Sequence, residues 1–79
     1  MRVVYICTAG SADPTKASLP WHLAVNGSLA EGHEPIMVLA GDATDLVVGD
    51  TVDTLEGLGV PPMRELVTKA RQHEVPVFV

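Results

Sequence analysis

The feature that most constrains the fold is residues 2–30, where a short apolar segment turns into a helix. Arg2–Thr8 is rich in β-branched residues, which is typical of a buried strand covered on both faces. Small residues follow, and then Asp13 and Pro14 mark a helix start. An aspartate there caps the first free N–H groups, and a proline loses nothing at the first helical position. A strand that leads into a helix in this way predicts an α/β fold.

The first helix is expected to run to about Ala30 or Glu31, with Gly32 as its left-handed cap. Pro20 should bend its first turns. One face of this helix is predicted to be buried because small and apolar residues recur on it at helical spacing. Those residues are Ala17, Trp21, Ala24, Val25 and Ser28.

The remainder of the chain predicts two more strands and one more helix. Residues 34–40 and 75–79 are apolar and are expected to be strands, the first of them parallel to residues 2–8 through a right-handed crossover. A second helix is expected after Pro62, because apolar residues recur there at helical spacing. Residues 43–59 are compatible with one short helix or two irregular turns.

Composition narrows the class of protein. Seventy-nine residues form one domain at most, and 47% hydrophobic residues with 19% charged ones indicate a globular chain. The net charge of −5 argues against a nucleic-acid partner. One cysteine excludes an internal disulfide and fits the cytoplasm. No apolar run approaches the roughly 20 residues that span a membrane, and no signal peptide is evident. We expect a single cytoplasmic domain over residues 1–79, which forms oligomers because so short a chain is so apolar.

Ligands of open α/β sheets bind at the carboxyl ends of the strands, where we expect two loops to meet. Backbone N–H groups and one lysine near the first loop are candidates to bind an anion, and the loop after the second strand adds two more residues. These candidates are Thr8, Gly10, Ser11, Asp13 and Lys16 from the first loop and helix start, and Gly41 and Asp42 from the second. Capping alone would explain Asp13, and a lysine in the first helical turn is more often simply solvated. The first loop has too few glycines for a dinucleotide fingerprint and has no phosphate-binding GxxxxGK[ST] motif.

Cys7 is the candidate nucleophile, because a thiolate at the end of the first strand would accept sulfur. The alternative is a small buried hydrophobic residue, which is the usual state of a lone cysteine. His22 could pair with Cys7 in space, although nothing in the spacing supports this. His33 and His73 each follow a helix and precede a strand, which places them away from the proposed site. No metal-ligand motif is present, and neither a metal nor another cofactor is predicted.

Several segments, taken in order, resemble the DsrE/DsrF-like family, which includes sulfur-relay proteins of the TusBCD type and YchN-like proteins. The segments are Val4–Gly10, Asp13–Ala17, Leu19–Ala24, Met37–Asp42, Pro61–Val67 and Val75–Val79. The resemblance implies a three-layer α/β/α fold with a mainly parallel sheet, related to flavodoxin-like folds. It also implies assembly into a homo-oligomer: a dimer, trimer or hexamer.

The function that this resemblance implies is sulfur relay, with a sulfur-donor or sulfur-acceptor protein as partner. Sulfur-relay members carry sulfur as a persulfide on a cysteine just after a later strand. This chain ends at Val79, about where that segment would begin, so the last part of the family fold is expected to be absent. Cys7 does not occupy the position of that carrier. Two alternatives remain: a non-catalytic binding or assembly subunit of an oligomeric complex, and a small-anion or nucleotide-binding α/β domain.

Overall fold

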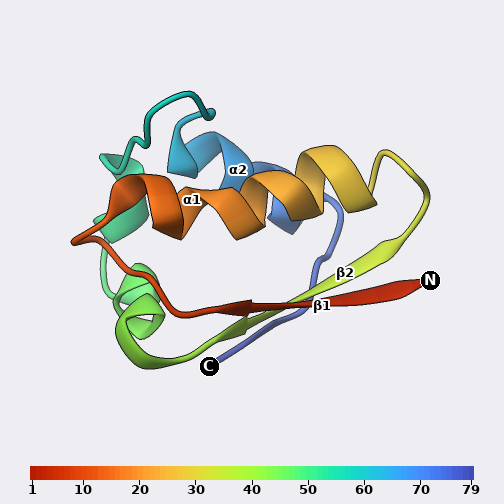
Figure 1. Cartoon of the computed structure of the whole chain (residues 1–79), viewed down its shortest axis with the longest axis horizontal. Helices are drawn as coiled ribbons and strands as arrows, with labels where there is room; N and C mark the ends of the chain where they lie inside the picture. Colours follow the sequence, from red (N-terminus) through yellow and green to blue (C-terminus); the bar gives the residue numbers. More distant parts are fainter.

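A computed structural model describes all residues, 1–79, as a small α/β unit (Figure 1). In chain order, the elements are β1 (Arg2–Cys7), α1 (Pro14–Leu23), the π-helix η1 (Ala24–Ser28), β2 (Glu34–Leu39), the 3-10 helices η2 (Gly41–Val47) and η3 (Thr51–Asp53), α2 (Met63–Gln72) and β3 (Val77–Phe78). The stretch 43–59 thus contains two separate 3-10 helices, where the sequence left open one short helix or two irregular turns. No helix is long and apolar enough to cross a membrane.

The three strands form one parallel sheet in the order β1-β2-β3. Arg2 to Cys7 pair with Glu34 to Leu39, and Met37 pairs with Val77. This arrangement confirms the α/β class and the parallel pairing of the first two strands that the sequence predicts.

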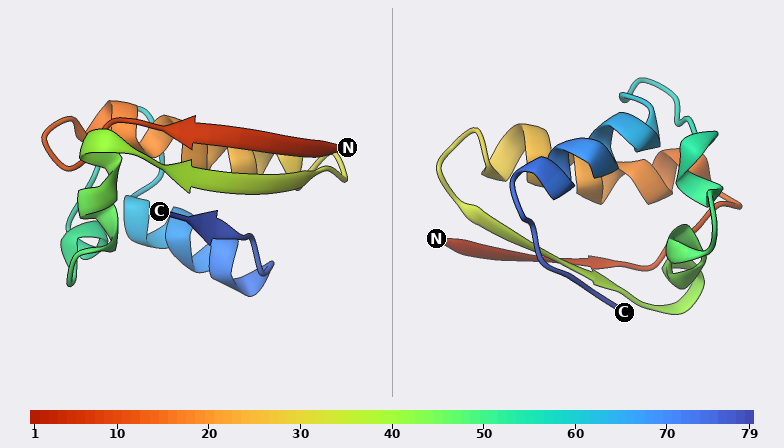
Figure 2. Two further views of the ribbon diagram at one scale, coloured as in Figure 1. Left: turned by 90° about the horizontal axis from the view of Figure 1, so that it is seen from below. Right: turned by 180° about the vertical axis from the view of Figure 1, so that it is seen from behind.

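Both long helices lie on the same face of the sheet (Figures 1 and 2). The strand order explains this arrangement. Right-handed crossovers that step across a sheet in one direction put their helices on one side, and here β2 lies beside β1 and β3 beside β2. Residues 1–79 therefore form two layers, and the expectation of three layers is not met within this chain.

The strands show the alternating burial of a sheet covered on one side. In β1, the side chains of Val4 and Ile6 are 55% and 68% exposed, whereas Cys7 is only 2% exposed. In β2, Met37 and Leu39 are buried beneath the helices. The expectation that β1 is covered on both faces is therefore wrong, because successive side chains of a strand point to opposite faces and one face has no helix.

The core lies between the helices and the covered face of the sheet. All five residues of the predicted stripe on the first helix are buried, and α2 adds Met63, Leu66 and Ala70. The hydroxyl groups of Tyr5 and Ser28 form a hydrogen bond of 2.5 Å from β1 to η1. Apolar packing with one polar tie thus holds the helical layer to the sheet.

The boundaries of the first helix follow the expected capping chemistry. The backbone N–H of Lys16 donates to Asp13 Oδ1 at 3.1 Å, and Pro14 is the first helical residue. The α-helix ends at Leu23 and continues as the π-helix to Ser28, two residues short of the predicted end. Gly32 has the left-handed φ of 78° that a helix cap requires.

Candidate functional site

The two loops at the carboxyl ends of β1 and β2 meet, as the sequence predicts, and are joined by hydrogen bonds. The backbone N–H of Ser11 donates to both carboxylate oxygens of Asp45, at 3.1 and 3.2 Å. The Ser11 hydroxyl donates to Asp45 Oδ2 at 2.6 Å. The Ser11 N–H was a candidate to bind an external anion, but it already donates to the carboxylate of Asp45.

Gly10 brings these two loops into direct contact. A Cβ at this position would lie 2.1 Å from the carbonyl oxygen of Asp42 and 2.6 Å from Asp45 Oδ1. No side chain fits in that space, so only glycine allows the loops to approach this closely. Gly10 and Ser11 therefore act as a structural junction between the first loop and η2.

The other predicted residues of these loops lie at the surface. Thr8, Gly41 and Asp42 are exposed. Asp13 caps α1, and its carboxylate also lies 4.0 Å from the exposed ammonium group of Lys16. Capping of α1 therefore explains the presence of Asp13. The exposed ion pair between Asp13 and Lys16 contributes little to the free energy of folding.

Cys7 is enclosed beneath the helical layer. The residue is 2% exposed, and its thiol donates a weak hydrogen bond to the carbonyl oxygen of Tyr5 at 3.6 Å. Burial raises the pKa of Cys7 from its ordinary 9.0 to about 11. A thiol acts as a nucleophile only as the thiolate, and this environment keeps Cys7 protonated at neutral pH. The geometry favours the buried hydrophobic residue over the sulfur acceptor.

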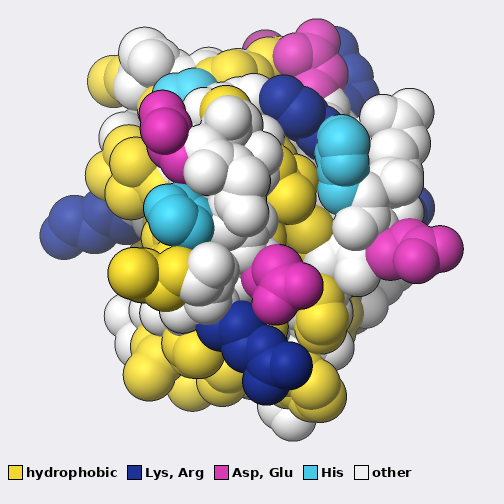
Figure 3. Space-filling model, turned by 90° about the vertical axis from the view of Figure 1, so that its right-hand side faces the viewer, with side chains coloured by type: hydrophobic (Ala, Val, Ile, Leu, Met, Phe, Trp, Pro, Cys, Tyr) yellow, Lys and Arg dark blue, Asp and Glu magenta, His cyan; other side chains and the backbone are white.

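The histidines do not join the carboxyl-end loops. His22 lies nine residues after Asp13, about 13 Å farther along the helix, and its Nδ1 is 3.0 Å from the side-chain amide nitrogen of Asn26. His33 and His73 line one hollow at the opposite end of the sheet. Figure 3 views the molecule from that end. No group of three or more histidine, cysteine or acidic side chains is arranged to hold a metal ion.

A second candidate is the sheet face that no helix covers, which we call the open face. It consists of apolar side chains from all three strands, namely Val4, Ile6, Ile36, Val38 and Phe78. The strand register aligns them into rows: Val4 is paired with Ile36, and Ile6, Val38 and Phe78 follow one another across the sheet. Sequence reasoning missed this surface, because the same apolar residues would be expected in a sheet covered on both sides.

The amino end of the open face carries charge. Arg2 and Glu34 are paired in the register of β1 and β2, and Arg2 Nε lies 3.5 Å from Glu34 Oε2. Both side chains are largely exposed. The open face is thus an apolar surface with an exposed ion pair at one end.

The chain matches no protein-family model, no curated protein and no solved structure. The likeness to the DsrE/DsrF-like family therefore depends on the sequence motifs alone. What the structure supports is the coarser class, a small α/β unit with a three-stranded parallel sheet.

Proposed function

We propose that this chain is a cytoplasmic, non-catalytic assembly subunit of DsrE-like type, which associates with a second copy through its open face. The observation that carries the proposal is the apolar row formed by Ile6, Val38 and Phe78 across all three strands. Ile6 and Phe78 are 68% and 59% exposed. Contiguous apolar surface of this kind typically marks a site where proteins meet.

A second copy suits the shape of the open face. Two sheets can stack face to face with their apolar side chains interleaved, and a two-fold axis brings the same surface of each copy together. The strands give this face a length of about 20 Å and a width of about 10 Å. Stable dimers commonly bury about 800 Å² on each partner, so the open face alone supports a weak, concentration-dependent dimer.

The burial of Cys7 favours a role in assembly over a role in sulfur transfer. A sulfur carrier needs an accessible thiolate, whereas this thiol is buried and its pKa is raised by burial. The nucleotide-binding alternative is also weaker, since the Ser11 N–H already binds Asp45. Intact mass spectrometry after incubation with polysulfide checks this ranking, because assembly without catalysis predicts no gain of a sulfur atom.

The proposal is tested by placing one negative charge on the open face. We expect sedimentation equilibrium to show the wild-type chain shifting from monomer to dimer as concentration rises, and Ile6→Glu remaining monomeric. Leu58→Glu is the matched control, because Leu58 is 86% exposed, lies in a loop and receives the same charge change.

Circular dichroism of both variants verifies that they are folded. A wild-type chain that stays monomeric up to about millimolar concentration would refute self-association. Dimerisation that is equally strong in Ile6→Glu would instead place the interface elsewhere on the molecule.

A further inference from the structure

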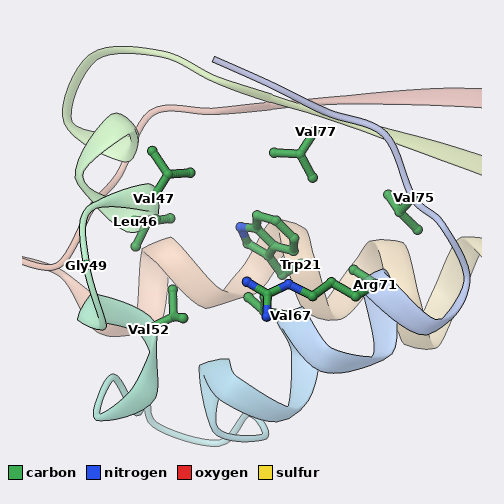
Figure 4. Close-up of a pocket in the computed structure, with 10 residues that line it drawn as sticks. Trp21, Leu46, Val47, Gly49, Val52, Val67, Arg71, Val75 and Val77 are labelled. Atoms are coloured by element: carbon green, nitrogen blue, oxygen red, sulfur yellow. The ribbon is translucent and has the colours of Figure 1, made fainter.

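A separate cavity lies on the helical side of the sheet, between α2, β3 and the 3-10 helices (Figure 4). Its volume is about 250 Å³, and eight of its ten lining residues are apolar. The apolar wall includes Leu46, Val52, Val67 and Val77. This is the composition of a small-molecule site, which is mostly apolar with a few polar groups that set orientation.

Trp21 supplies the first of those polar groups. Its side chain is only 4% exposed and lines the cavity, yet its indole Nε1–H has no hydrogen-bond partner. In Figure 4 the nitrogen lies on the edge of the ring that faces Leu46 and Val47. Buried indole N–H groups normally find an acceptor. This donor has less than 1 Å² of accessible surface, so an acceptor on a ligand reaches it only when the side chains beside it move aside, and the acceptor then supplies a hydrogen bond that no group of the chain supplies.

Arg71 supplies the second polar group, and it is the charged residue of the lining. Its side chain extends across the cavity beside Trp21 and Val67 (Figure 4). Arg71 is exposed and takes part in neither of the two ion pairs of the chain, which are Arg2–Glu34 and Lys16–Asp13. No acidic residue lines the cavity. The free guanidinium therefore favours an anion, and its planar fork matches a carboxylate.

We propose that this cavity binds a small apolar carboxylic acid. The apolar part lies among the valine and leucine side chains, and the carboxylate accepts hydrogen bonds from Arg71 and from Trp21 Nε1–H. An apolar cavity of about 150 Å³ holds benzene, so this larger one suits a ligand of roughly ten non-hydrogen atoms. A phenyl ring on a short carboxylate chain has that size. The site is independent of self-association, because it lies on the helical side of the sheet.

The test uses Trp21 as its own reporter, because it is the single tryptophan of the chain. We would titrate with 3-phenylpropionate and with the uncharged 3-phenylpropanol, following tryptophan fluorescence and the indole N–H resonance by NMR. We expect the acid to bind about tenfold more tightly than the alcohol, which corresponds to about 1.4 kcal/mol for the charged contact. The indole N–H resonance should shift downfield only with the acid.

Arg71→Gln is the decisive variant, since an exposed position tolerates it. It should weaken binding of the acid about tenfold and leave binding of the alcohol unchanged. Arg64→Gln is the matched control: it removes the same charge from the same helix, two turns away, and Arg64 does not line the cavity. Its affinities should equal those of the wild type.

The proposal is overturned if 3-phenylpropionate leaves both signals unchanged up to its solubility limit. It is also overturned if acid and alcohol bind equally, or if Arg71→Gln binds the acid as the wild type does. The Ile6→Glu variant separates this result from the assembly proposal, because it should bind 3-phenylpropionate normally whether or not the wild type dimerises.

Discussion

The two faces of the sheet are made from alternate residues of the same strands, yet they have very different surroundings. On the covered face, Met37 is fully buried and Leu39 is 2% exposed. On the open face, Ile6 and Phe78 remain more than half exposed. The side chains of both faces are apolar. The difference therefore arises from connectivity, because two right-handed crossovers in the same direction put both helices on one side.

The largest effect is expected from a substitution on the covered face. Comparison with a substitution on the open face tests whether only the covered face contributes to the core. Met37→Ala should lower the free energy of unfolding by about 3 kcal/mol, because it removes a buried side chain and leaves a cavity. Ile6→Ala, on the open face, should lower it by less than about 1 kcal/mol, because Ile6 is already 68% exposed. Urea denaturation, at a concentration where the chain is monomeric, measures both. Equal losses would show that the open face is covered in the monomer.

A second prediction uses the thiol beneath the covered face. The pKa of Cys7 is raised by burial to about 11, against 9.0 for an ordinary thiol, so the folded chain holds this proton to higher pH than the unfolded chain. The contribution of Cys7 to stability is therefore complete below pH 9 and is lost as pH rises towards 11. The loss should approach about 2–3 kcal/mol.

Unfolding of the wild type and of Cys7→Ala across pH 8–11 isolates this contribution, because the other groups titrate alike in both chains. The stability difference between the two should be constant up to pH 9 and should then change in favour of Cys7→Ala. A difference that stays constant throughout would mean that the thiol reaches water.

A third prediction, with a smaller effect than the loss of Met37 or the ionisation of Cys7, concerns the loops that connect the covered face to its helices. Asp45→Ala removes the acceptor of all three Ser11 hydrogen bonds and should cost about 1.5 kcal/mol of stability. Asp50→Ala is the control, because Asp50 is exposed and caps η3 without a side-chain hydrogen bond. Thermal unfolding compares the two variants. If they lose the same small amount, apolar packing alone positions the loops.

Local features of the fold were predictable from sequence because they depend on neighbouring residues. The Asp13 cap, the buried stripe on the first helix and the left-handed Gly32 follow from chemistry within a few positions. The number of layers was not predictable in this way. A run such as Val3 to Ile6 is equally apolar whether one or two faces are covered, and only the strand order decides between these possibilities.

In the candidate sites, too, contacts between residues that are distant in sequence could not be predicted. The meeting of the two carboxyl-end loops followed from parallel topology. The role of Asp45 could not be predicted, because its partner Ser11 lies 34 residues away and no local pattern marks the pair. Trp21 and Arg71 are 50 positions apart in sequence and meet only at the cavity. Sequence reasoning placed Trp21 on the buried face of the first helix, which describes that residue but does not predict its position beside Arg71.

The sheet order also has a consequence for how the chain acquires its structure during synthesis. The strands stand side by side in the order in which a ribosome releases them, so each one can add to an edge that already exists. β1, α1 and β2 can associate while α2 and β3 are still being made, and no later strand has to insert between earlier ones. Each pairing then joins strands that are neighbours in the sequence, 32 residues apart for Arg2 and Glu34 and 40 for Met37 and Val77, so no closure spans the whole chain.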